Sequence, residues 1–283
     1  MSATTATTTL PANTGLSFPR LVRSEWIKLR SIRSTVWCYA ILVVLTIAMA
    51  VLIGTFVNQD GAAMPTDAAN ATTVSVNTAS VSITALVVGV LGVLIITGEY
   101  GTGQVRSTFT ADPGRIGVIL AKAFVLALAT FVVSVVSTWI GVLIATPLQA
   151  ANGIRPDLAD PAVFLPILGS SVYVTLLALL AYGIGLLVRS SAGGIAITLG
   201  ILLVLPVILS IFAGLTGAQW IADVGRFLPS DAGGQLFTYA SPAAETGATT
   251  GLVLNGWGGF AVLAAEVVAV GAAAIAVARA RDV

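Results

Sequence analysis

Long apolar segments recur along this sequence, and they constrain the fold more than any other feature. About 20 consecutive apolar residues cross a lipid bilayer as an α-helix. Hydrophobic residues make up 57% of the chain and charged residues only 9%, whereas a soluble domain typically carries about 25% charged residues. None of the segments shows the period-2 alternation of a membrane β-strand. We therefore predict an all-α, polytopic membrane bundle with six transmembrane helices, at about residues 36–57, 80–97, 116–147, 162–188, 192–213 and 252–278.

The start of the chain differs from these segments in composition. Residues 1–17 are rich in threonine and alanine, and they have neither the basic nor the apolar region of a signal peptide. We expect a disordered cytoplasmic tail here. The remaining residues, 18–283, are expected to form a single transmembrane domain.

The segment from Phe18 to Arg33 is predicted to be an amphipathic helix. Its apolar residues recur every three or four positions, as on one face of an α-helix, and basic residues occupy the other faces. This pattern favours a helix lying in the membrane interface. The alternative is a solvated helix whose apolar face packs against other helices. Glu25 falls inside the apolar stripe, where it either pairs with Lys28 three residues later or makes a functional contact.

A polar segment, Gly98–Arg115, separates the second and third apolar segments. It contains Glu99, Arg106 and several glycines, and its neighbours on both sides are membrane spans. Such a segment must lie at a water-facing surface. We predict that it receives the mechanical input of the membrane domain.

Basic residues indicate how the chain is oriented. If the N-terminus is cytoplasmic, eleven basic residues fall on the inner side and only Arg155 and Arg226 on the outer side. Cytoplasmic segments carry an excess of lysine and arginine. We therefore predict that both termini are cytoplasmic.

Two outer segments differ in character. Residues 58–79 are small and polar and are predicted to form a plain exposed linker. Residues 214–251 mix large apolar side chains with glycine, proline and aspartate, and they are too short to cross a bilayer. We predict re-entrant half-helices before the last span, separated at Leu228-Pro229-Ser230.

Few residue types that carry chemistry are present. The sequence has no histidine and a single cysteine, Cys38, which excludes an internal disulfide and disfavours a metal site. It lacks the phosphate-binding pattern G-x-x-x-x-G-K-[ST], and no basic cluster suits a nucleic acid. Glu266 lies near the middle of the last span, where a carboxylate is costly. It is a candidate for the translocation path, or it braces a neighbouring helix.

Several short motifs, taken in order, resemble the membrane permease subunit of the type-2 class of ABC exporters, in its actinobacterial form. The motifs are Glu25-Trp26-x-Lys28-Leu29-Arg30-Ser31, Gly98-Glu99-Tyr100-x-x-Gly103-x-x-Arg106, Arg115, Leu187-Val188-Arg189-Ser190 and Leu228-Pro229-Ser230-x-Ala232-Gly233.

The resemblance implies a permease that exports a drug-like, lipid-like or peptide substrate across the cell membrane. It also implies two cytoplasmic ATPase subunits, which bind ATP and Mg, and a second permease copy or paralogue. No cofactor is expected on this chain, and no catalytic residue. The coupling residues would be Glu99, Tyr100, Arg106, Arg115 and Arg189. The connecting helix would contain Glu25, Trp26, Lys28 and Arg30.

Two other classes remain open. One is a self-sufficient channel or an ion-coupled secondary transporter that uses Glu266. The other is a membrane-anchored enzyme or assembly factor without transport, which the missing histidine, the lack of a cysteine pair and the scattered carboxylates disfavour.

Overall fold

The computed structural model describes residues 17–58, 61–104, 116–240 and 253–280. All elements in these ranges are helical, and six helical segments are long and apolar enough to cross a membrane. The predicted all-α membrane bundle is therefore confirmed. The elements are α1 Phe18–Ser31, α2 Arg33–Phe56, α3 Thr66–Thr78, α4 Val81–Thr102, α6 Ile116–Ala151, α7 Pro161–Val188, α8 Ser191–Leu199, the π-helical η1 Gly200–Val204, α9 Leu205–Thr216, α10 Gln219–Gly225, α11 Pro229–Gly234, the 3₁₀-helical η2 Gln235–Phe237 and α12 Gly256–Ala280.

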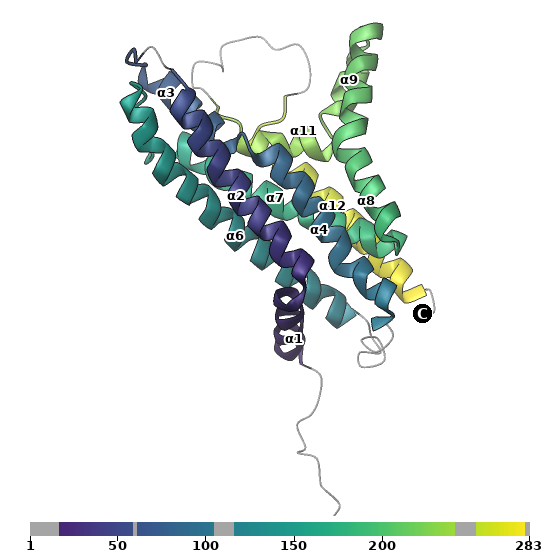
Figure 1. The fold of residues 1–283 in the computed structure, drawn as a ribbon. Helices are drawn as coiled ribbons and strands as arrows, with labels where there is room; N and C mark the ends of the chain where they lie inside the picture. The colour runs from purple at the N-terminus through teal and green to yellow at the C-terminus, as the bar shows by residue number, and fades with distance from the viewer. Residues whose placement is uncertain (1–16, 59–60, 105–115, 241–252, 281–283) are drawn as a thin grey trace, which may run out of the picture.

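The centre of the bundle is the contact between α4 and α7, the most extensive contact between two elements. Glycines allow the two backbones to approach each other. A Cβ atom on Gly92 would collide with the carbonyl oxygen of Ala178, and one on Gly185 would lie 3.1 Å from the backbone of Val93. Small residues at such positions let membrane helices pack by direct backbone contact. On the other sides, α6 packs against α2 and α7, and α12 packs against α7 (Figure 1).

Residues 66–78 are not the exposed linker that the sequence suggested. They form α3, and α4 starts three residues after α3 ends. One face of α3 is buried against α2, α6 and α7, including Asn70, Thr73 and Asn77. The sequence did not indicate this buried face, because its small polar side chains form no apolar stripe. Thr73 donates its hydroxyl to Gln149 Oε1 of α6 at 2.9 Å, and Asn70 donates to Asp160 at the start of α7, so these two groups keep hydrogen bonds after burial removes them from water.

The fifth span packs against the bundle in its first part and separates from it in its second part. Its first part, α8, packs against α4 and α7, whereas no residue of α9 is buried. Figure 1 shows α9 leaning away from the other long helices. The π-helical turn Gly200–Val204 lies just before Pro206, and a proline within a helix removes one backbone hydrogen bond and crowds the preceding turn.

The segment before the last span contains two short helices, α10 and α11, with Leu228 just before α11. The helix break falls at the predicted position. Gly233 of α11 packs against the ring of Tyr173 in α7, and Gly259 of α12 lies directly on the carbonyl oxygen of Ala232. Entry of these helices into a membrane leaflet stays a prediction, and residues 241–251 lie outside the described part of the chain.

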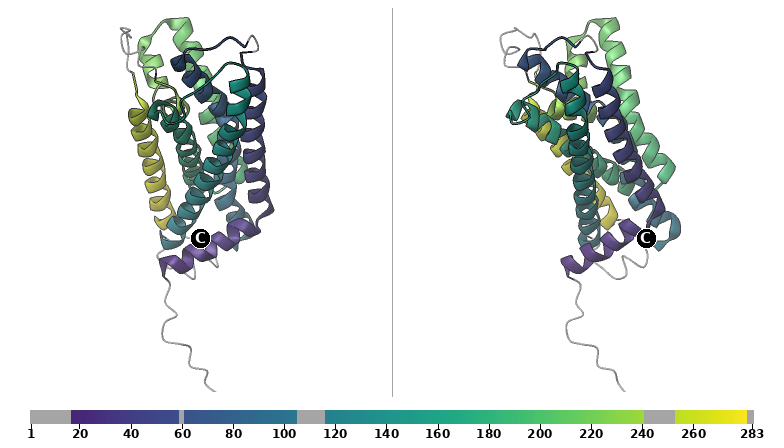
Figure 2. Two further views of the ribbon diagram at one scale, coloured as in Figure 1. Left: turned by 90° about the vertical axis from the view of Figure 1, so that its left-hand side faces the viewer. Right: turned by 60° about the vertical axis from the view of Figure 1, so that its left-hand side comes forward.

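At the opposite end of the molecule, α1 runs across the lower end of the bundle (Figure 2). Ile32 is extended, with φ −87° and ψ 118°, and separates α1 from α2. We call this end the α1 end and the opposite one, where α3 begins, the α3 end. Glu25 and Leu29 are the buried residues of α1. Its position in the membrane interface stays a prediction, and the predicted disordered tail falls almost wholly on residues 1–16, outside the described residues.

Candidate functional site

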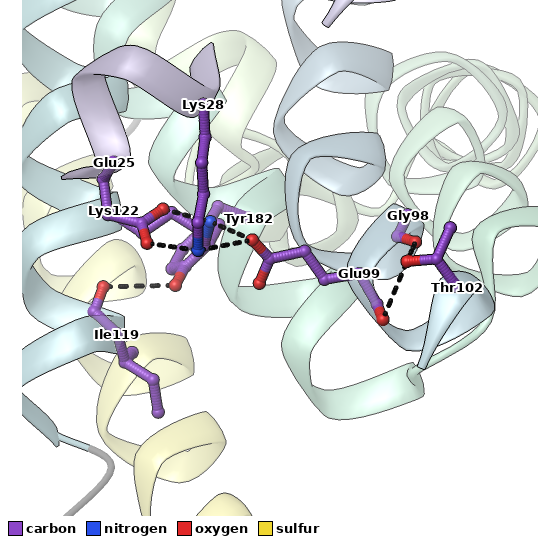
Figure 3. A network of polar contacts seen from close by, with 8 residues as sticks. All are labelled: Glu25, Lys28, Gly98, Glu99, Thr102, Ile119, Lys122 and Tyr182. Atoms are coloured by element: carbon purple, nitrogen blue, oxygen red, sulfur yellow. Dashed lines mark hydrogen bonds and ion pairs between the residues drawn. The ribbon is translucent and has the colours of Figure 1, made fainter. Parts of the chain in front are cut away.

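Four charged side chains from three helices meet at the α1 end. Glu25 and Lys28 come from α1, Glu99 from the last turn of α4, and Lys122 from the second turn of α6. We call these four residues the charge cluster. Figure 3 shows them in one closed arrangement in which each lysine contacts both carboxylates.

The distances are those of hydrogen-bonded ion pairs. The Nζ atom of Lys28 lies 2.8 Å from Glu25 Oε1 and 3.3 Å from Glu99 Oε1. The Nζ atom of Lys122 lies 2.8 Å from Glu99 Oε1 and also pairs with Glu25 Oε2. Two positive and two negative charges therefore balance within the cluster.

Burial makes this balance necessary. The side chain of Lys28 is 26% exposed, whereas those of Glu25, Glu99 and Lys122 are at most 7% exposed. A buried charge that loses its partner is strongly destabilising, by about 3–5 kcal/mol. Burial lowers the pKa of Lys28, but the hydrogen bond to Glu25 and the charge of Glu99 more than offset this. The pKa of Lys28 is therefore raised above its ordinary value.

Neighbouring contacts hold the helices that carry the cluster. Tyr182 of α7 donates its hydroxyl to the carbonyl oxygen of Ile119, one turn before Lys122, at 3.1 Å. The hydroxyl of Thr102 donates to the carbonyl of Gly98 at 3.1 Å, and the glycine that follows, Gly103, ends α4 with a φ of 72°. A left-handed glycine is a common helix stop, so α4 ends within one turn of Glu99.

A second contact at the same end joins α4 to the turn between α7 and α8. The guanidinium carbon of Arg189 lies 5.3 Å from the centroid of the Tyr100 ring, a cation–π distance. Arg189 ends α7 in a left-handed conformation, with a φ of 56°. The Ser191 hydroxyl, two residues later, donates to Thr97 Oγ1 at 2.8 Å. The predicted coupling residues Glu99, Tyr100 and Arg189 therefore lie on adjoining elements.

Other predicted residues lie elsewhere. Trp26 and Arg30 are exposed on α1. Arg106 and Arg115 lie outside the described residues. Glu266 is on α12, and its Oε2 atom is enclosed without a hydrogen-bond partner in the described part of the chain. The assignment of any of these residues to coupling or to a translocation path stays a prediction.

The structure differs most from the sequence prediction in the contacts of Glu25 and Lys122. The predicted pair of Glu25 with Lys28 is confirmed, and Glu25 also binds Lys122, 97 residues away. Lys122 is one of the eleven inner-side basic residues, and sequence reasoning does not indicate it as a site residue. Its signal was a single lysine within a long apolar segment. Both lysines of the sequence lie in this cluster, although the other eleven basic residues are arginines. The ammonium group of lysine is a compact charge with three donors, so a single Nζ atom can contact both carboxylates.

Six membrane-crossing helices with charges gathered at one end define a multi-pass membrane protein. The chain belongs to the family of ABC-2 family transporter proteins, whose family model matches residues 21–204. The matched region contains all four residues of the charge cluster. Among curated proteins, no match to the sequence is found. The chain is thus the permease component of an ABC transporter, with an ABC ATPase as its implied partner, and it is not itself catalytic.

Proposed function

We propose that this permease exports its substrate from the cell with energy from ATP that a separate ATPase subunit hydrolyses. The α1 end faces the cytoplasm of a cell membrane, and both termini are on that side. The excess of basic residues in the segments assigned to this side supports the orientation. The substrate is drug-like, lipid-like or a peptide, the classes that the resemblance to exporters suggests.

The charge cluster is the observation that carries the proposal. It ties α1 to α4 and α6, and α4 leads directly into the polar segment Gly98–Arg115. An ATPase that displaced this segment or α1 would therefore displace both spans, because their buried charges cannot separate cheaply. Glu99 serves as the link to α6 in this scheme, and Arg106 and Arg115 are the candidates for direct contact.

We further propose that two ATPase subunits bind two permeases, either two copies or a copy and a paralogue. The ATPases bind ATP and Mg, since the sequence of this chain lacks the phosphate-binding pattern. The α9 helix supports the pairing, because none of its residues is buried against the rest of the described chain, whereas α2, α4, α6, α7 and α12 each have buried residues. A second permease would give this helix a packing partner.

The test is to purify the permease together with its ATPase in lipid vesicles and to measure ATP hydrolysis. A cationic dye, a phospholipid and a short peptide serve as probes of the three substrate classes. Glu99→Lys and Lys122→Glu, each alone, should abolish probe-stimulated hydrolysis, and the double exchange should restore part of it. Arg226→Ala, at the other end, is the control. Stimulation that survives both single exchanges would show that the cluster does not couple the subunits.

A second candidate function, ion-coupled transport, is favoured by Glu266, whose enclosed Oε2 atom has no partner among the described residues. An ionisable group within a span often marks an ion pathway. A Glu266→Gln variant that loses transport driven by an ion gradient, in vesicles without ATP, would support this function. If transport requires ATP in both the wild-type protein and the Glu266→Gln variant, ion-coupled transport is excluded.

A further inference from the structure

The outer face of α1 carries positive charge that no acid of the same helix offsets. Glu25, the acidic residue of α1, is buried in the charge cluster, where Lys28 and Lys122 bind it. Arg23 and Arg30 are seven positions apart, which places them on one face of the helix, opposite Glu25. Both arginines are exposed, and the ion pairs of the described residues include neither.

Arg33, the first residue of α2, extends this positive charge. Ile32 alone separates Arg33 from α1, and Arg33 is also exposed and outside the described ion pairs. The segments that adjoin α1 and α4 in the sequence, 1–16 and 105–115, contain one aspartate and two arginines. By sequence they therefore add positive charge to this part of the chain. We call Arg23, Arg30 and Arg33 the arginine surface.

The length of α2 places Arg33 at the level of lipid headgroups. From Trp37 to Phe56, exposed aromatic residues near its two ends, α2 rises about 29 Å at 1.5 Å per residue. The hydrocarbon core of a bilayer is about 30 Å thick, and tryptophan is enriched at its boundary. Arg33 lies one turn before Trp37, about 6 Å outside that boundary. The headgroup layer extends about 5–7 Å beyond the hydrocarbon, so Arg33 lies within it.

We propose that the arginine surface binds the headgroup phosphates of anionic phospholipids. A guanidinium group pairs with a phosphate through two parallel hydrogen bonds, and phosphates are the oxyanions present at the depth of Arg33. A zwitterionic lipid would add a cation beside three arginines, whereas an anionic lipid brings the opposite charge. Ile27 lies between Arg23 and Arg30 on the same face and is 57% exposed. Apolar and basic side chains together are typical of a helix at the membrane interface.

Native mass spectrometry of the full chain in a neutral detergent tests the proposal without an ATPase. The protein is titrated with phosphatidylglycerol and, separately, with phosphatidylcholine that has the same acyl chains. Wild type should bind phosphatidylglycerol more tightly, and equal affinity for the two lipids would overturn the proposal. Each basic residue near an anionic surface strengthens binding about fivefold. The preference should therefore fall about 25-fold in Arg30→Gln/Arg33→Gln. The proposal does not depend on the export function.

A matched variant separates the arginine surface from the net charge of the protein. Arg155→Gln/Arg226→Gln also removes two arginines, at the other end, and should keep the preference for phosphatidylglycerol. An equal loss in this control would reject the site. A preference that survives Arg30→Gln/Arg33→Gln while co-purification with the ATPase is lost would assign these arginines to the ATPase and refute the lipid site. If that variant fails to fold, salt decides. In wild type, the preference should weaken as salt is raised, and a preference independent of salt would overturn the proposal.

Discussion

The two ends of this molecule are held together by different chemistry. At the α1 end, four charges from three helices form buried ion pairs. At the α3 end, hydrogen bonds join elements without a buried ion pair among the described residues: Asn70 Nδ2 donates to Asp160 Oδ2 at 3.2 Å, and Tyr239 donates its hydroxyl to Asp67 Oδ1 at 2.8 Å. The described ion pair nearest this end, Arg226 with Asp223, is 3.9 Å long and more than one third exposed.

The difference concerns how each end can come apart. A typical hydrogen bond contributes about 0.5–1.5 kcal/mol, so such contacts can break one at a time. Buried ion pairs depend on each of their enclosed members, because removing one where water cannot replace it leaves another charge without compensation. The α1 end should therefore move as a unit, whereas the α3 end can rearrange in steps.

The largest effect should follow the loss of Lys122. The variant Lys122→Met leaves two buried carboxylates with a single partner, and the free energy of unfolding should fall by about 3–5 kcal/mol. Thermal unfolding of the protein in detergent measures the loss. Lys122→Arg keeps the charge and serves as its control. A loss below about 1 kcal/mol for Lys122→Met would show that the charge cluster does not hold the α1 end together.

A smaller loss should follow the removal of a buried amide at the α3 end. Asn70 accepts a hydrogen bond from the backbone nitrogen of Asp157 at 2.8 Å and donates one to Asp160. Asn70→Ala should therefore cost about 1–3 kcal/mol. The exposed Ser75, whose hydroxyl bonds its own helix, provides Ser75→Ala as a control. A loss equal to that of Lys122→Met would erase the contrast between the two ends.

Lys28 should matter much less than Lys122, although the two lysines bind the same carboxylates. Its side chain reaches water, so Lys28→Met should cost about 1 kcal/mol near neutral pH. The pKa of Lys28 is raised in the folded state from its ordinary 10.5. The stability it contributes is therefore complete below that value and is lost as pH rises through the folded-state pKa. The difference between wild type and variant should shrink only above about pH 10.5; shrinkage between pH 7 and 9 would contradict this.

The smallest effect is expected for Tyr239→Phe. The hydrogen bond from Tyr239 to Asp67 is exposed, and water can replace it at little cost. The loss should be about 0.5 kcal/mol, detectable as a shift of about one degree or two in the unfolding temperature. A loss above about 2 kcal/mol would mean that this bond closes the α3 end cooperatively.

The six spans were predictable because each apolar segment is long enough to cross a bilayer, whatever it packs against. α3 was not, because threonine, alanine and asparagine form no apolar stripe and its burial depends on partners such as Asp160. At the site, spacing along one helix predicted the pair of Glu25 with Lys28. Lys28 and Glu99 are 71 positions apart in the sequence, and Glu25 and Lys122 are 97 positions apart. Only the folded chain brings these residues together.

One further consequence follows from the length of α6. This helix runs without interruption from Ile116 to Ala151, and it carries Lys122 at one end and Gln149 at the other. About 40 Å separate these two residues along the axis, at 1.5 Å per residue. A tilt of about 5° around Lys122 would swing Gln149 through about 3.5 Å over that length. That exceeds the 2.9 Å between Gln149 Oε1 and the hydroxyl of Thr73. A tilt of that size at the ion pairs would therefore break the hydrogen bond between Gln149 and Thr73 at the opposite end of the helix.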